Sequence, residues 1–235
     1  GPGAGLIKHF FYPGFTARTG GLLREPNLAR RQREFDRTAW LTHQRIPDHR
    51  ERLVSLFCYQ PSALDGLLDQ LAQAAQPTRL LVTAGQATVA TQAAIEHKNR
   101  LKPLWNNRKK LLISYLSALS QLDFDHLLWA CDLNFVRGED SLVRALWAGK
   151  PFVWQIYPQD DAAHLGKLDA FLDWLQAPPS LRQFHRAWNG TATSLGALAP
   201  IDDAGWGQAV VAARTRLRAR DDLTTQLLRF VLKNR

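Results

Sequence analysis

Five short segments that are apolar along nearly their whole length recur through this chain of 235 residues. Strands that carry apolar residues continuously, without alternating with polar ones, are covered on both faces, which is typical of parallel sheets. Segments with helical spacing of apolar residues separate them, and this alternation favours an α/β fold. The sequence therefore predicts a Rossmann-like parallel sheet flanked by helices. The expected strands are residues 52–59, 79–85, 110–116, 133–138 and 151–157.

Helices are expected between these strands and after the last of them. In the first helix, leucines at positions 64, 67, 68 and 71 share one face. Asp123 is interpreted as the cap of the helix that precedes the fourth strand. The expected helices are residues 62–75, 88–100, 124–131, 141–148, 161–176, 181–188 and 205–232.

An excess of basic residues predicts an anionic partner. Thirty lysines and arginines stand against 21 aspartates and glutamates, a formal net charge of +9. A nucleic acid, a nucleotide, a phosphorylated ligand or an acidic protein would each satisfy this charge, and solvated helix faces such as residues 212–222 are the simpler alternative. Cys58 and Cys131 are too few for a disulfide framework and are expected to be reduced and buried.

The chain shows neither an apolar run of about 20 residues, the length that crosses a bilayer, nor the pattern of a secretory signal. A cytoplasmic protein without a membrane partner is therefore expected. Residues 1–5 are interpreted as the remnant of a tag or linker, and residues 6–235 as one domain.

The stretch RGEDS, from Arg137 to Ser141, follows the fourth apolar segment. In open parallel sheets, ligands bind beyond the carboxyl ends of the strands, where helix N-termini expose unpaired N–H groups. We expect the Arg137 guanidinium, the amides of Asp140 and Ser141 and the Ser141 hydroxyl to converge on a diphosphate. Gly138 would allow close approach, and Glu139 would face a sugar hydroxyl or a cation. The alternative is an ordinary helix cap with a solvated Glu139 and an ion-paired Arg137.

Other candidate residues have simpler interpretations. Tyr157 would contact a nucleotide or merely pack at the end of its strand. Asp123 and Asp125 resemble the paired aspartates of metal-dependent transferases, but their place at a helix start favours capping. His164 is interpreted as a helix-face residue, and no metal site is predicted. The signatures of P-loop ATPases, dinucleotide-dependent oxidoreductases and G-x-S-x-G hydrolases do not occur in the sequence.

Two longer stretches occur together in the order and spacing of one known family. They are FFYPGFTARTGGLLRE (10–25) and FVRGEDSLVRALWAGKPFVWQIYPQDDAAHLGKLDAFLDW (135–174). From about residue 6 onward the chain resembles EarP, the bacterial protein-arginine rhamnosyltransferases that modify elongation factor P. The resemblance implies the C-terminal half of a GT-B glycosyltransferase that transfers L-rhamnose from dTDP-β-L-rhamnose, with inversion, to an arginine of elongation factor P. No metal is implied.

The resemblance also implies roles for the residues of the RGEDS stretch. Arg137, Asp140 and Ser141 would hold the diphosphate. Glu139, the catalytic candidate, would lie beside the rhamnose and the reacting arginine.

Three further residues are implied to surround the nucleotide. Gln121 and Tyr157 would contact it, and Phe15 would line the pocket from the first loop. The N-terminal acceptor domain of the family has no counterpart in this sequence, so the chain alone is expected to bind dTDP or dTDP-rhamnose without transferring the sugar. The alternative from another class is a basic nucleic-acid-binding module, suggested by the charge and by eight tryptophans.

Overall fold

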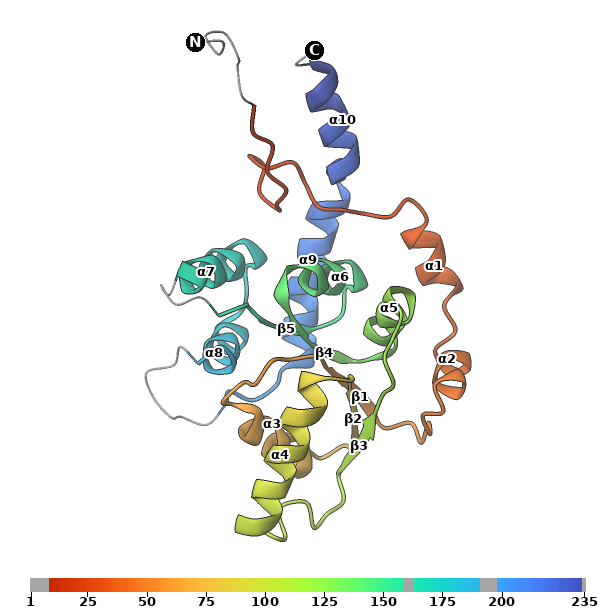
Figure 1. Ribbon diagram of the computed structural model, residues 1–235, viewed down its shortest axis with the longest axis vertical. Helices are drawn as coiled ribbons and strands as arrows, with labels where there is room; N and C mark the ends of the chain where they lie inside the picture. Colours follow the sequence, from red (N-terminus) through yellow and green to blue (C-terminus); the bar gives the residue numbers. More distant parts are fainter. Residues whose placement is uncertain (1–8, 159–162, 191–197, 234–235) are drawn as a thin grey trace, which may run out of the picture.

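The computed structural model describes residues 9–158, 163–190 and 198–233. Its centre is a five-stranded sheet in the order β3-β2-β1-β4-β5, with every pair of neighbouring strands parallel (Figure 1). Each strand overlaps one of the five predicted apolar segments, so the predicted Rossmann-like sheet flanked by helices is confirmed. The strands are β1 (Arg52–Leu56), β2 (Thr78–Val82), β3 (Leu111–Tyr115), β4 (Leu133–Arg137) and β5 (Phe152–Gln155).

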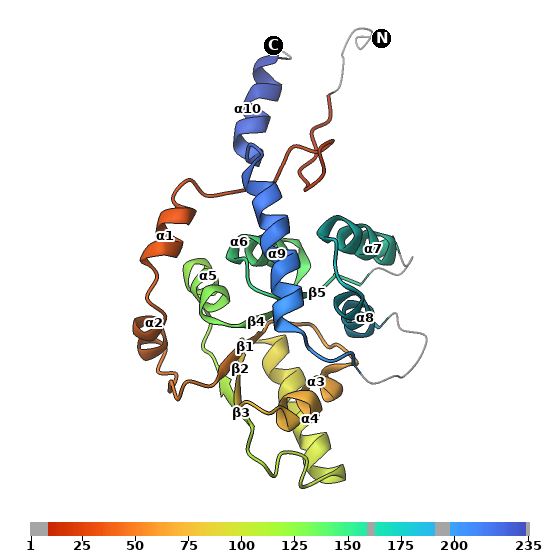
Figure 2. The same cartoon turned by 180° about the vertical axis from the view of Figure 1, so that it is seen from behind.

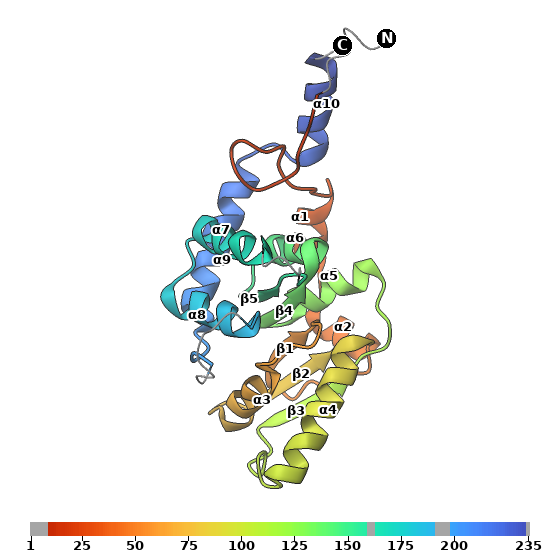
Figure 3. The same ribbon diagram turned by 60° about the vertical axis from the view of Figure 1, so that its left-hand side comes forward.

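Helices precede, connect and follow the strands. They are α1 (Leu28–Glu34), α2 (Arg37–His43), α3 (Leu64–Gln73), α4 (Gln86–Leu101), α5 (Gln121–Ala130), α6 (Gly138–Ala148), α7 (Ala163–Leu175), α8 (Pro179–Trp188), α9 (Asp203–Arg218) and α10 (Leu223–Lys233). In the view from behind, α9 runs beside α6 and past β5 (Figure 2). Helix α10 continues away from the sheet with the first described residues beside it (Figure 3).

The sheet is covered on both faces, as its apolar strands require. Val54 and Leu56 of β1 belong to the same buried cluster as the leucines of α3. Leu53 of the same strand instead packs in a second cluster with Leu127 of α5 and Leu41 of α2. Successive strand residues point to opposite faces, so one strand supplies both cores.

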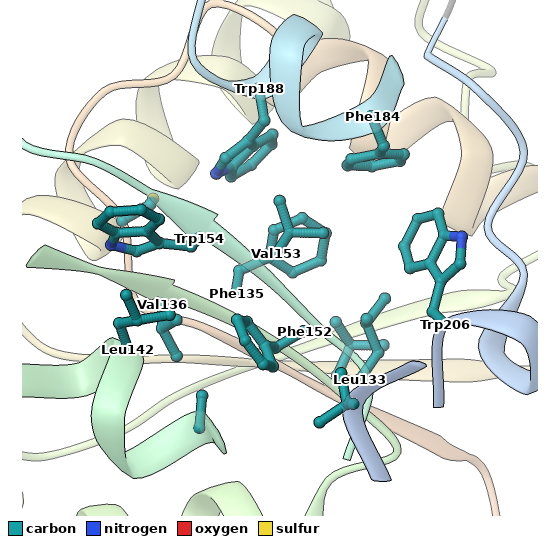
Figure 4. Close-up of a cluster of buried hydrophobic side chains, with 14 of the residues drawn as sticks. Leu133, Phe135, Val136, Leu142, Phe152, Val153, Trp154, Phe184, Trp188 and Trp206 are labelled. Atoms are coloured by element: carbon teal, nitrogen blue, oxygen red, sulfur yellow. The ribbon is translucent and has the colours of Figure 1, made fainter. Parts of the chain in front are cut away.

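Aromatic side chains fill the core around β4 and β5. Figure 4 shows Phe184 and Trp188 of α8 on one side of these strands and Leu142 of α6 on the other. The ring centroids of Phe135 and Trp188 are 4.6 Å apart, and Trp206 is fully buried. All eight tryptophans are buried or half-buried, so they pack in or against the core and do not stand free to stack on bases, as the nucleic-acid alternative supposed.

His185 of α8 lies in this core with no exposed surface. Its Nε2 atom accepts a hydrogen bond from the backbone N–H of Trp154 at 3.0 Å. Its Nδ1 atom lies 3.0 Å from the carbonyl oxygen of Leu181, to which it donates in the tautomer that this arrangement requires. A neutral imidazole therefore makes both hydrogen bonds, one through each ring nitrogen. Burial lowers the pKa of His185 to about 4.

Several predicted element boundaries were wrong. The helix expected over 205–232 is two helices, because Asp222 caps α10 by accepting from the backbone N–H of Thr225 at 3.1 Å. Helix α5 begins at Gln121 and is capped by Ser120, whose hydroxyl accepts from the N–H of Asp123 at 3.1 Å. Helices α1 and α2 were not predicted, although Asp36 accepts from Ala39 N–H as a cap at 3.0 Å.

Both cysteines are free and buried, as expected. Burial raises the pKa of the Cys58 thiol to about 12, and the pKa of Cys131 is raised as well. Within the described ranges, no helix is long and apolar enough to span a membrane.

Candidate functional site

A cavity of about 710 Å³ opens at the carboxyl ends of the strands. It lies where β1 and β4 are neighbours, and from these two strands the chain proceeds in opposite directions across the sheet. Such a switch point is where open α/β sheets bind ligands. The lining residues are Phe57, Tyr59, Thr83, Ala84, Ser117, Ala118, Leu119, Ser120, Gln121, Phe124, Arg137, Gly138, Glu139, Asp140, Ser141 and Arg144.

Arg137 is the last residue of β4, and its guanidinium lies against the loop that follows β1. Its Nη1 atom donates to the carbonyl oxygen of Cys58 at 3.1 Å and to the side-chain oxygen of Gln86 at 2.6 Å. Its Cζ atom is 4.4 Å from the ring centroid of Phe57 and 4.5 Å from that of Tyr59. Cation–π contacts and two acceptors thus fix a permanent positive charge at the cavity wall.

Helix α6 begins at Gly138, three residues earlier than predicted. Among the described residues, no side chain caps it. The N–H groups of Gly138, Glu139 and Asp140 lie in the first turn and lack intrahelical acceptors, at the end of a helix where an anion is favoured. Gly138 has φ +67°, a conformation that glycine adopts without strain. The amides without an intrahelical acceptor are therefore those of residues 138–140: they include the predicted amide of Asp140 but not that of Ser141.

The Ser141 hydroxyl is occupied by the protein itself. It accepts from the backbone N–H of Arg137 at 3.0 Å and donates to the carbonyl oxygen of the same residue. Ser141 is 3% exposed, although it lines the cavity. The hydroxyl thus fixes the junction between β4 and α6. The predicted donation of this hydroxyl to a diphosphate would require its bond to the Arg137 carbonyl oxygen to break.

Two carboxylates stand in the first turn of α6. Asp140 is exposed and pairs with the Nε atom of Arg144 at 3.2 Å. Glu139 is exposed and forms no ion pair or hydrogen bond with the residues that the structure describes. The pKa of the nearby Tyr59 is raised, mainly by burial. The positive charge of Arg137 opposes this shift, and the negative charge of Glu139 adds to it. Glu139 is therefore the carboxylate of the cavity that is available to a cationic or hydroxyl-bearing ligand.

Gln121 lines the cavity from the first turn of α5, beside the capping residue Ser120. Phe124, one turn further, adds an aromatic ring that meets Phe57 edge-on with centroids 5.3 Å apart. This side of the cavity is apolar and aromatic, whereas the α6 side carries the charges. The division suits a ligand with one planar, weakly polar end and one anionic end.

Two predicted site residues do not line the cavity. The Phe15 ring packs against Trp174 of α7 with centroids 4.7 Å apart, and against Phe171. Tyr157 is 59% exposed, and its ring contacts that of Tyr59, a lining residue, with centroids 5.7 Å apart. The structure therefore brings Gln121, Arg137 and residues 139–141 together and leaves Phe15 and Tyr157 outside. What each of them binds stays a prediction.

The lining residues that sequence reasoning missed include Phe57, Tyr59, Phe124 and Arg144. The tripeptide FCY (57–59) directly after the first strand was a usable signal, because side chains at a strand's carboxyl end reach the binding edge. Arg144 gave no signal of its own, since it sits among the ordinary polar positions of a helix. Among the described residues, no cluster of three or more His, Cys, Asp or Glu side chains could hold a metal ion.

The fold and the cavity define a class: Rossmann-like α/β domains with an anion-attracting helix start at the switch point of the sheet. The sequence profile of the elongation factor P (EF-P) rhamnosyltransferase EarP matches residues 1–232. The chain belongs to the EarP family.

Relatives of known name agree with this membership. The chain is 38% identical to a protein-arginine rhamnosyltransferase of Pseudomonas aeruginosa and 39% identical to one of Pseudomonas putida, in both cases over 96% of this chain. It spans 64% of the length of each of these two proteins. A solved structure that explains EarP-mediated arginine glycosylation of translation elongation factor EF-P superposes with a TM-score of 0.78 at 33% identity. That match covers 95% of this chain and 76% of the other.

Proposed function

We propose that this chain binds the nucleotide-sugar donor of a protein-arginine rhamnosyltransferase, dTDP-β-L-rhamnose, whose sugar passes to an arginine of EF-P. The relatives' names support the reaction class. The observation that carries the proposal is the cavity at the switch point, where Arg137 and the uncapped start of α6 stand together. The domain would serve as the donor half of a GT-B transferase working in the cytoplasm.

The charges of the cavity fit the departure of a nucleoside diphosphate. When the bond between the anomeric carbon and the diphosphate oxygen breaks, negative charge grows on the diphosphate. Arg137 is held at the cavity wall by its own contacts, and the amides of residues 138–140 lack intrahelical acceptors, so these groups would stabilise the charge with little reorganisation. The reaction we propose therefore proceeds without a metal.

The aromatic side of the cavity suits the base. Phe57 and Phe124 give this part of the lining apolar aromatic surface against which a planar thymine would pack, and Gln121 has an amide that donates and accepts hydrogen bonds. A pyrimidine has such a planar ring with polar edges. The aromatic end and the charged end together fix the direction in which the donor enters.

Glu139 meets the requirement of the acceptor. An arginine guanidinium is normally protonated and a poor nucleophile, so a carboxylate must orient it toward the anomeric carbon. Glu139 is exposed at the cavity and is unpaired within the described residues. We assign to it contact with the rhamnose and with the reacting guanidinium during an inverting single displacement. In this step the guanidinium nitrogen bonds to the anomeric carbon as dTDP leaves, and its proton passes to a base that we place in the part of the transferase this chain does not span.

Calorimetric titration with dTDP tests the donor site. We expect binding by the wild type and a loss of at least tenfold for Arg137→Ala, since hydrogen bonds to charged groups contribute about 1.5–3 kcal/mol. Arg229→Met, which removes an exposed ion pair on α10, is the matched control and should bind like the wild type. Absence of binding at millimolar dTDP, or equal affinity for dTDP and for a single-stranded oligonucleotide, would contradict the proposal.

A further inference from the structure

A row of alternating charges runs from the segment before α1 into the cavity. Glu25 pairs with Arg31 of α1, and Arg31 Nη2 lies 2.9 Å from a carboxylate oxygen of Asp125. The other oxygen of Asp125 accepts from Nη1 of Arg144 at 2.8 Å. Arg144 then reaches Asp140 through Nε at 3.2 Å. We call these five side chains the Asp125 network.

The network is anchored inside the protein and ends at the cavity. The side chains of Asp125 and Arg144 are 6% and 11% exposed, whereas that of Asp140 is 76% exposed. A buried carboxylate that accepts from two guanidiniums is fully engaged, and it fixes both partners in return. The buried Asp125 therefore fixes the position of Arg144, and Asp140 is the exposed end of the network, where a ligand would make contact.

The place of Asp140 poses an electrostatic problem for an anionic ligand. Glu139 and Asp140 stand in the first turn of α6, where carboxylates occupy the same positive end of the helix that would attract a diphosphate. Two unneutralised carboxylates there would repel it. Arg144 cancels the charge of one of them while the other stays available to the sugar.

We propose that Arg144, fixed by the buried Asp125, is a positioning residue that neutralises Asp140 and thereby keeps the start of α6 open to the diphosphate of the donor. This inference rests on the proposed donor site. It also assigns to Asp125, the second aspartate of the sequence DFD, a role other than helix capping. Asp123 makes the cap contacts of α5, and Asp125 orients an arginine of the next helix.

A double-mutant cycle with dTDP as the titrant tests the proposal. We expect Arg144→Met to weaken binding on the order of tenfold, because a bare carboxylate then faces the diphosphate. Asp140→Asn in the same chain removes that carboxylate, so the double variant should bind within about threefold of Asp140→Asn alone. Arg144→Gln, which keeps a hydrogen-bond donor toward Asp125, serves if Arg144→Met does not fold, and Arg229→Met is the control remote from the cavity.

The outcomes separate the two proposals. If the wild type does not bind dTDP, the donor site itself is wrong. If it binds and the double variant is as weak as the variant lacking only Arg144, then Arg144 acts through folding or direct contact and the inference is overturned. Restoration by Asp140→Asn supports it, since a merely structural loss would not be repaired by removing a charge on the surface.

Discussion

Acidification should destabilise this protein through one buried histidine. His185 accepts from the Trp154 N–H, is fully buried, and has a pKa lowered to about 4 by burial, against 6.5 when unperturbed. The folded state therefore binds a proton on His185 less readily than the unfolded state does. Above pH 6.5 His185 is neutral in both states, so it does not make the free energy of unfolding depend on pH. The free energy of unfolding falls as the pH drops from 6.5 toward 4.

The expected loss follows from the size of this difference. Each pKa unit corresponds to about 1.4 kcal/mol, so the free energy of unfolding should fall by about 2 kcal/mol between pH 7.5 and pH 5. Burial alone would raise the pKa values of Glu51 and Asp222, but hydrogen bonds to the carboxylates outweigh it and lower both pKa values. The stability that these two carboxylates contribute is therefore lost only below their ordinary pKa values of 4.5 and 3.8. The window above pH 5 therefore reports on histidines. Burial also lowers the pKa of the partly buried His126, so a variant of His185 is needed to isolate the contribution of His185.

Urea unfolding at pH 7.5 and pH 5 for wild type and His185→Gln measures the effect. Glutamine offers an acceptor to the Trp154 N–H but does not titrate, so the variant should be less stable at pH 7.5 and should lose about 2 kcal/mol less than the wild type on acidification. His43→Gln changes an exposed histidine and should behave like the wild type. Equal acid losses in wild type and His185→Gln would refute the reasoning, because the imidazole would then titrate as it does in the unfolded chain.

Three further predictions follow from single features of the fold. Gly138→Ala places a side chain at φ +67° and should lower the free energy of unfolding by about 1 kcal/mol and weaken dTDP binding; an unchanged melting temperature and affinity would contradict the need for glycine at this junction. Trp188→Ala should cost about 3–5 kcal/mol in urea unfolding, and a cost below 1 kcal/mol would mean that the aromatic core collapses around the gap. Cys58 and Cys131 should not react with a thiol reagent at pH 8 until urea is added, and rapid labelling of the native protein would show that their burial is transient.

Local patterns in the sequence accounted for the strands and most helices. Continuous apolar runs and leucines at helical spacing depend only on neighbours along the chain, so β1 to β5 and α3 were predicted within a few residues. The same local reasoning placed RGEDS at the carboxyl end of a strand. It misplaced the starts of α5 and α6 because helix capping depends on which backbone groups find hydrogen-bond partners. Ser141, for example, forms its hydroxyl hydrogen bonds with the backbone of Arg137 and does not begin the helix.

The sequence by itself determined that a parallel sheet would present Arg137 and a helix start at one edge, since strand direction and helix polarity follow from the chain's order. Only the tertiary structure decided what stands around them. The strand order puts β1 beside β4 and so brings Phe57 and Tyr59 onto the guanidinium. Packing with α7 takes Phe15 away from the cavity. Strand order and helix packing are set by apolar contacts between segments far apart in the chain, and no short stretch of sequence records them.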